Sequence, residues 1–386
     1  MTPQRPSLGP LTQGNPAIFA TLGHGLVQTP YTPTSEDWQS ASHDFAYSHL
    51  AAVALSVMPQ RSALSSTRRY LQFVAFEQAA YSRNLLTASI PLLAELLGRG
   101  CRFLLIKGPT FAPYHASPHH RTYTDIDIFV ARGDYQLAVR TARHHGYLTA
   151  TPAQPRDWMS RHCLEALSLR SDEGSNIDLH HTLAPWIFGR ALSFDTLAAD
   201  ASTTQVGDLS LPSPSAPHLL SISAIHILNN LWRNATSYMA WRDLLAIAVH
   251  LGPQASSDAL RAADLGWLIS PLASALQAVS THAQVFAPTT RSYRASRRAR
   301  LHYAGWDSQT RRLSDPLRWA LRLPAARALG YVTGSLFPSR QYVAAQHLTY
   351  PHYWRRTAAH LFQPERAAAH SVTAGSTEPP FATPAE

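Results

Sequence analysis

Between residues 101 and 183 the sequence alternates short apolar runs with one amphipathic segment, and this alternation constrains the fold more than any other feature. CRFLLIKG (101–108), DIDIFVA (125–131) and YLTAT (147–151) have the length and apolar content of strands. A helical repeat at 133–146 separates the last two, and two further strands are predicted within 163–183 around the turn SDEGSN. Short strands interleaved with helices predict a small mixed sheet flanked by helices, in the α+β class.

Helical periodicity lies on both sides of this segment. Apolar residues recur at three- and four-residue steps across residues 65–98, where Pro91 predicts a kink or a break. After residue 190 the strand signals fade and the apolar pattern becomes helical. The chain is therefore predicted to divide into an irregular N-terminal lead-in, an α/β domain, a linker with room for a small hairpin, a helical C-terminal domain and a disordered tail, at residues 1–42, 43–203, 204–217, 218–364 and 365–386.

Two acidic residues at the start of a predicted strand are the clearest chemical signal. Asp125 and Asp127 are two positions apart, so on a strand they share a face, with their Cα atoms about 7 Å apart. Carboxylates at that distance repel each other unless a cation lies between them, and hard oxygen ligands suit Mg²⁺ or Mn²⁺. Asp178, in the apolar run NIDLH, supplies a third carboxylate if its strand is a neighbour. The alternative is a pair at the edge of a turn and a separate residue at the end of a strand.

A possible phosphate-binding segment precedes the acidic strand. Lys107 is the only lysine in a chain whose other basic residues are all arginine, and it is followed by Gly108. Glycine permits close backbone approach, and a helix that starts here offers free N–H groups to a phosphate. Thr110 adds a hydroxyl, whereas Pro109 has no N–H to contribute. The segment does not fit the Walker A pattern, and chance retention of one lysine is an equally open explanation.

These motifs together resemble a known family. LLIKGPTFAPYH, RTYTDIDIFV, AVRTARHHGYL and NIDLHH occur here in the order seen in the uncharacterised nucleotidyltransferase branch of the DNA polymerase beta-like superfamily. The resemblance covers residues 66–185 and weakens towards 250. It implies a nucleotidyltransferase-type sheet, Mg²⁺ held by Asp125, Asp127 and Asp178, with Asp178 as the base, and phosphate contacts from Arg121, Lys107 and Gly108. The chain departs from the wider superfamily at Pro109, where Ser or Gly follows the glycine.

Other polar residues have weaker signals. His180 shares a strand face with Asp178, which makes it a nucleotide-binding candidate, and a polar strand end is the equal alternative. Trp241, Arg242 and Asp243 lie on a predicted helix that could reach the cleft, although an ion pair on the helix surface is the favoured interpretation, and His226 is expected at the edge of the core. The remaining histidines and Cys163 lack the spacing of zinc ligands.

Composition restricts the partners without identifying them. A net charge of +9 and the arginine-rich stretch 291–322 are compatible with a polyanion, but no RNA-binding module or zinc motif is recognisable, so nucleic acid is possible and not favoured. Two cysteines exclude a disulfide scaffold, and no apolar run is long enough for a membrane span. The N-terminus lacks the apolar core of a secretory signal, so a cytoplasmic protein is expected.

The resulting hypothesis is a Mg²⁺- or Mn²⁺-dependent nucleotidyltransferase. It would move a nucleoside monophosphate, or a related phosphate-linked group, from a nucleoside triphosphate to a hydroxyl or phosphate of a small-molecule or peptide acceptor. Natural-product or polysaccharide biosynthesis is the setting that the resemblance implies. The alternative is a catalytically inactive binding or regulatory module that keeps the fold.

Overall fold

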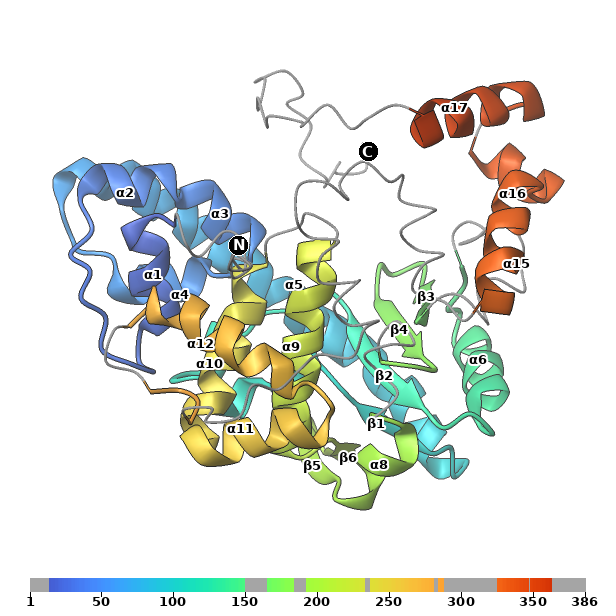
Figure 1. Cartoon of the computed structure of the whole chain (residues 1–386), viewed down its shortest axis with the longest axis horizontal. Helices are drawn as coiled ribbons and strands as arrows, with labels where there is room; N and C mark the ends of the chain where they lie inside the picture. Colours follow the sequence, from blue (N-terminus) through green and yellow to red (C-terminus); the bar gives the residue numbers. More distant parts are fainter. Residues whose placement is uncertain are drawn as a thin grey trace, which may run out of the picture.

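A four-stranded mixed sheet lies at the centre of the protein (Figure 1). The structure, a computed structural model, describes residues 14–149, 165–183, 192–232, 237–280, 284–287, 325–346 and 348–362. The strands are β1 (Phe103–Leu105), β2 (Ile126–Val130), β3 (Ala166–Arg170) and β4 (Asn176–His180), in the order β1-β2-β4-β3. The inner pair β2–β4 is parallel and both outer pairs are antiparallel, so the predicted small mixed sheet is confirmed.

The two faces of the sheet pack against different helices. On one face, Ile126 and Ile128 of β2 share an apolar core with α5 (Ser65–Gly98) and α6 (Tyr135–His144). On the other face, Leu104, Ile106 and Phe129 join the larger core that includes α9 (Ala216–Trp232) and α10 (Tyr238–Leu251). Since side chains alternate along a strand, polar residues between the isoleucines of β2 and β4 are directed towards α9 and α10.

The described part of the N-terminal lead-in is helical, which corrects the prediction that residues 1–42 are irregular. Its helices are α1 (Pro16–Gly23) and α2 (Ser35–Ser40), followed by α3 (Ser42–Tyr47) and α4 (Ala51–Val57). Asn15 caps α1 by accepting a hydrogen bond from the N–H of Ala17, and Pro16 occupies the first turn. The apolar side chains of α1 are buried in the larger core, which stabilises a helix too short to persist alone.

Helix α5 runs unbroken for 34 residues, so the break predicted at Pro91 does not occur. A proline inside a helix removes one backbone hydrogen bond and crowds the preceding turn. Here Leu92, Leu93 and Leu96 follow it, and all three are fully buried against the sheet. Burial of these side chains, at about 1.5–3 kcal/mol each, offsets the local cost of the proline.

One predicted strand beside the sheet is almost absent, whereas the hairpin predicted in the linker is present. The strand expected at 147–151 is reduced, in its described part, to a single bridge between Leu148 and Arg170. The small hairpin allowed for in the linker is present as β5 (Ser202–Val206) and β6 (Leu209–Ser213), which turns at Gly207. Val206 and Leu211 are buried in the core shared with α5 and α6.

The described part of the C-terminal region is mainly helical, as predicted. Its helices and 3₁₀ turns after α10 are α11 (Pro253–Ala262), η6 (Gly266–Leu268), α12 (Ile269–Gln277), α15 (Ala325–Leu336), α16 (Arg340–Ala345) and α17 (Tyr350–Phe362). The shorter elements earlier in the chain are η2 (Ser62–Leu64), η3 (Gly108–Thr110), η4 (Ala112–Tyr114), η5 (Pro118–His120) and α8 (Phe194–Ala199). None of the helices in the described part of the chain has the length and hydropathy that crossing a membrane requires. The arginine-rich stretch 291–322 and the tail 365–386 lie outside the described residues.

Candidate metal and phosphate site

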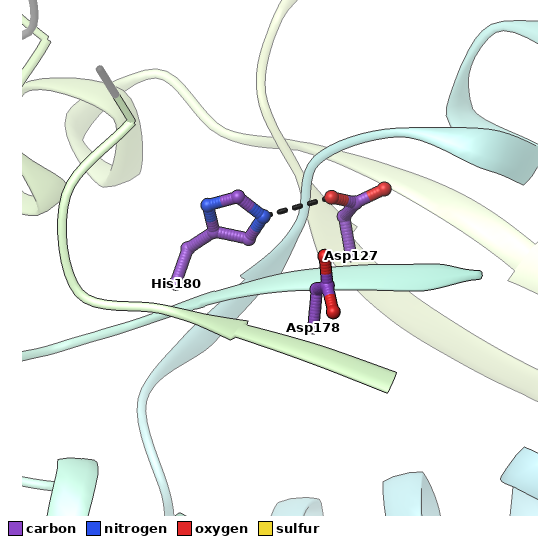
Figure 2. A group of neighbouring side chains, drawn as sticks. All are labelled: Asp127, Asp178 and His180. Atoms are coloured by element: carbon purple, nitrogen blue, oxygen red, sulfur yellow. Dashed lines mark hydrogen bonds and ion pairs between the residues drawn. The ribbon is translucent and has the colours of Figure 1, made fainter. Parts of the chain in front are cut away.

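The parallel pairing of β2 and β4 brings two of the predicted carboxylates together. Asp127 and Asp178 are register partners on adjacent strands, and both are directed to the face opposite the α5–α6 core (Figure 2). Asp127 is buried, whereas Asp178 is half-buried. The spacing of apolar residues on each strand therefore fixes which face carries the acids, and the register fixes their separation.

His180 completes this group. It lies on β4 one alternation beyond Asp178, and its Nε2 is 2.8 Å from Oδ1 of Asp127. One donor atom from each of Asp127, Asp178 and His180 lies within 4.8 Å of the others. The group thus contains the residue that the sequence marked only as a nucleotide-binding candidate.

Lys107 places a positively charged side chain next to Asp127. It follows β1, and its Nζ is 2.8 Å from Oδ1 of Asp127, with 22% of its side chain exposed. Burial opposes the charge of Lys107, but the carboxylates of Asp127, Asp125 and Asp178 raise its pKa above the usual value. Burial likewise opposes the charge of Asp127, but Lys107 and His180 hold the pKa of that carboxyl well below its usual range. Asp127 is therefore the ionised centre of the cluster.

Asp125 lies near this group, but the sheet does not fix its position. It lies one residue before β2 begins, outside the ladder that positions Asp127. The charge of Asp127 and then burial raise the pKa of Asp125 to about 7. The expected trio of Asp125, Asp127 and Asp178 thus becomes a closer group of Asp127, Asp178 and His180, with Asp125 beside it. A cation bound nearby would stabilise the ionised form of Asp125, which is otherwise disfavoured.

The segment after Lys107 forms short 3₁₀ turns, so the helix whose N-terminus was predicted to bind a phosphate is not formed. Gly108 has a φ of +63°, which the rest of the turn requires, and it lines the cleft. Thr110 is buried and is not among the residues that line the cleft. Tyr123 packs over Gly108, and its backbone N–H and C=O both bond to Ser82 of α5 at 2.8 Å. Helix α5 therefore holds the loop that leads to Asp125.

Replacing Gly108 with Ala is expected to lower the free energy of unfolding by about 1–2 kcal/mol, because an L side chain is strained at positive φ. The new Cβ would also lie 3.3 Å from the Tyr123 ring. Gly174 is the matched control, since its φ is +80° and no other atom lies within 4 Å of the place that an added Cβ would take. Urea unfolding of both variants separates the two contributions: equal losses would show that contact with Tyr123 has no effect.

Asp127 of this cluster lines a cleft of about 190 Å³, or about 780 Å³ with its open mouth, whereas Asp178 and His180 are not among its lining residues. The rest of the lining comes from Lys107 and the loop that follows it to Asp125, from residues 47–49, and from the region of α9 and α10. These two helices contribute Ile222, Ser223, His226, Met239, Ala240 and Asp243. Burial lowers the pKa of His226 to about 3, so this imidazole is uncharged at neutral pH. The residues that α9 contributes to the cleft are therefore uncharged at neutral pH, whereas α10 contributes the charged Asp243.

Arg121 also lines the cleft, and its partner was missed in the sequence. Asp243 is buried, and its two carboxylate oxygens accept from Nε of Arg121, at 2.9 and 3.0 Å.

Arg242 is fully buried as well, so the predicted surface ion pair of Arg242 and Asp243 is wrong. The available signal was the apolar sequence on both sides of this pair, since a helix that is apolar all round is buried. His226, expected at the core edge, lies half-buried in the cleft wall.

The donor set fits one divalent cation of the kind that binds oxygen and nitrogen. Two carboxylates and an imidazole within 4.8 Å of one another suit Mn²⁺, or Mg²⁺ with fewer protein ligands, and Asp178 is only half-buried. Lys107 and Arg121 add two cations to the lining of the cleft that Asp127 also lines. Such an arrangement can bind a polyphosphate and stabilise negative charge that develops on it.

Two comparisons with known proteins found a match. A family described as "Uncharacterised nucleotidyltransferase" matches residues 34–267. A solved structure, described as an antigenic nucleotidyltransferase-like protein from Paracoccidioides brasiliensis, is similar with 17% sequence identity and a TM-score of 0.31, over 50% of this chain and 92% of that one. No curated protein matches the sequence.

Proposed function

Because this chain belongs to the uncharacterised nucleotidyltransferase family, we propose that it transfers a nucleoside monophosphate from a nucleoside triphosphate to a hydroxyl or phosphate of an acceptor. The observation that supports this most is the pairing of Asp127 with Asp178 across two parallel strands, with Asp127, Lys107 and Arg121 lining one cleft. We propose a small molecule or a peptide as the acceptor.

The reaction needs positioning and charge stabilisation more than covalent help. The acceptor oxygen bonds to the α-phosphorus, the bond from that phosphorus to the bridging oxygen breaks, and pyrophosphate leaves. Asp127, Asp178 and His180 would hold Mg²⁺ or Mn²⁺, which supplies neutralising charge to the phosphate oxygens when bound. Asp178 is the more exposed carboxylate of the group, so it is the one placed to accept the proton of the acceptor hydroxyl.

The apolar and hydroxyl-bearing residues of the cleft lining are suited to the nucleoside. Ser48 and Ser223 line the cleft with hydroxyl groups that are buried and have no hydrogen-bond partner within the described part of the chain. Ile222 and Met239 supply apolar surface beside them. A nucleobase combines an apolar face with hydrogen-bonding edges, so it would satisfy both kinds of surface.

Binding of a nucleoside triphosphate is expected to require a divalent cation. Calorimetric titration of ATP, GTP, CTP and UTP, with Mn²⁺, with Mg²⁺ and with EDTA, tests this on the wild type and on Asp178→Asn. The substitution is expected to raise the Kd of the cation-dependent binding tenfold or more, since it removes a ligand charge from the site. Asp172→Asn is the control, because Asp172 is exposed in the turn between β3 and β4 and is expected to leave the Kd unchanged.

The outcomes separate the two function hypotheses. Cation-dependent binding that Asp178→Asn weakens would support the transferase and justify a screen of acceptors by pyrophosphate release. No binding of any nucleotide by folded wild-type protein would contradict the proposal and favour the inactive binding module. Equal binding by wild type and Asp178→Asn would place the nucleotide elsewhere on the protein.

A further inference from the structure

The guanidinium of Arg121 is held on several sides. Its Nε donates to both carboxylate oxygens of Asp243, and its Nη1 donates to the backbone carbonyl of Thr122. The ring of Phe111 lies against it, with its centroid 5.7 Å from Cζ. The Arg121 side chain is only 11% exposed. Nη2 is the guanidinium nitrogen without a hydrogen bond to any described residue, and Arg121 lines the cleft.

Asp243 is itself fixed from a second direction. Its Oδ1 lies 2.8 Å from Nε2 of His115, whose side chain is fully buried. Burial opposes the charge of Asp243, but Arg121 and then His115 keep the pKa of its carboxyl below the usual range. Asp243 belongs to α10, whereas His115 and Arg121 belong to the loop between β1 and β2. One buried carboxylate therefore ties this loop to the helical region at two positions.

We propose that Asp243 is a positioning residue that holds Arg121 in the orientation in which Nη2 binds a phosphate of the nucleotide. This inference rests on the proposed function, since it assigns the phosphate contact within that same cleft. A free arginine side chain samples many rotamers, and a guanidinium already held by a carboxylate loses less freedom when it binds an anion. Lys107, the other cation, is held in the same way by Asp127.

The charge balance of the pair supports this role over that of a simple counter-ion. Asp243 offsets the charge of Arg121 where both are buried, which lets a guanidinium lie at the cleft wall without bound phosphate. Both oxygens of Asp243 accept from Nε, Oδ1 also bonds to His115, and no hydrogen bond to Nη2 is found among the described residues. The carboxylate thus orients the guanidinium while leaving one donor for a ligand.

A double-mutant cycle on nucleotide affinity tests the inference. The variants are Arg121→Ala, Asp243→Asn and the double variant, and the probe is the triphosphate that wild type binds most tightly, titrated with Mn²⁺ present. Asp243→Asn is expected to raise the Kd about tenfold in the wild-type background, as loss of a residue that orients a ligand-binding group does. It is expected to have no further effect in the Arg121→Ala background, because the group that it positions is then missing.

A purely structural role predicts a different pattern. If Asp243 only anchors α10 to the loop, Asp243→Asn weakens binding by the same factor with or without Arg121, and that result would overturn the inference. The loss should also be smaller for the monophosphate than for the triphosphate, and equal losses would contradict a phosphate contact. Thermal unfolding of each variant establishes that folded protein is being compared.

A second variant covers the case in which Asp243→Asn does not fold. His115→Gln keeps a side-chain N–H that can reach Asp243 and leaves the bonds to Arg121 intact, so we expect a rise in Kd of only a few-fold, again absent in the Arg121→Ala background. The same rise in both backgrounds would overturn the inference. Wild-type protein that binds neither a nucleotide nor inorganic tripolyphosphate would overturn the proposed function and the inference together, whereas nucleotide binding with an additive cycle would overturn the inference alone.

Discussion

Replacing Asp127 with Ala is expected to lower the free energy of unfolding by about 3 kcal/mol and to abolish Mn²⁺ binding. The carboxylate accepts from Lys107 and from His180, both at 2.8 Å, and Ala would leave these two groups without their shared partner. The expected loss is at the lower end for a broken buried pair because Lys107 is 22% exposed and Asp125 and Asp178 remain close to it. Urea unfolding in EDTA measures the stability, and Mn²⁺ titration measures the site.

Asp125→Asn, two residues earlier, is the matched control and is expected to have the opposite effect on stability. The pKa of Asp125 is raised to about 7 by the charge of Asp127 and by burial, so its ionised form is disfavoured in the folded protein. Asn removes that cost, and the gain at pH 8 without metal is expected to be roughly 1–2 kcal/mol. Equal losses of stability in the two variants would contradict the assignment of Asp127 as the paired acid and Asp125 as the repelled one.

The pH dependence of the stability difference between Asp125→Asn and wild type is a second test of this explanation. Below about pH 4 Asp125 is protonated in both the folded and the unfolded chain, so Asn and Asp should be equally stable there. Between pH 4 and pH 7 the unfolded chain ionises Asp125 while the folded protein does not, because the folded pKa is about 7. The stability advantage of Asp125→Asn should therefore grow over this range and level off above it. A gain that shrinks with rising pH would rule out this explanation.

The strand positions of Asp127 and Asp178 and the face that each occupies could be predicted, because local sequence determines them. Alternation on each strand sets the face of the sheet, and the apolar neighbours show that both strands are buried. The parallel register and the exclusion of Asp125 from the ladder could not be predicted, since both depend on where β2 begins relative to β4. Two of the three predicted acids, Asp127 and Asp178, lie in the closest group of possible metal ligands, where His180 takes the place expected for Asp125; their role in binding a metal stays a prediction.

The partners of Arg121 depend on contacts that the sequence pattern does not encode. Asp243 is 122 positions from Arg121 and 128 from His115. A carboxylate next to an arginine on a helix is usually an exposed pair, and nothing local distinguishes this one except the apolar residues around it. The same reason explains α1, whose Asn-Pro start was visible but whose stability comes from burial against α10 and α4.

Replacing Arg242 with Met is expected to lower the free energy of unfolding by about 3–5 kcal/mol. The guanidinium is fully buried and donates to the carbonyls of Thr21 and Leu22 at 2.8 Å and of His24 at 2.9 Å. These carbonyls end α1, and such groups need partners when the helix end is buried. Burial lowers the pKa of Arg242 to about 10, which still leaves it charged at neutral pH. Methionine retains apolar contacts but leaves the carbonyls of Leu22 and His24 without the donor that Arg242 supplies, and leaves that of Thr21 with only the backbone N–H of His24.

The loss should be concentrated at α1, and this distinguishes it from a general weakening of the core. Amide hydrogen exchange under native conditions should increase most at residues 16–23, because Arg242 joins that helix end to α10. Arg261→Met is the control: Arg261 pairs with Asp258 on the surface of α11, and its loss is expected to cost about 0.5 kcal/mol or less. If both variants lost the same stability, or if exchange increased evenly through α10 and α1, Arg242 would not be the residue that anchors the N-terminal helix to the wall of the cleft.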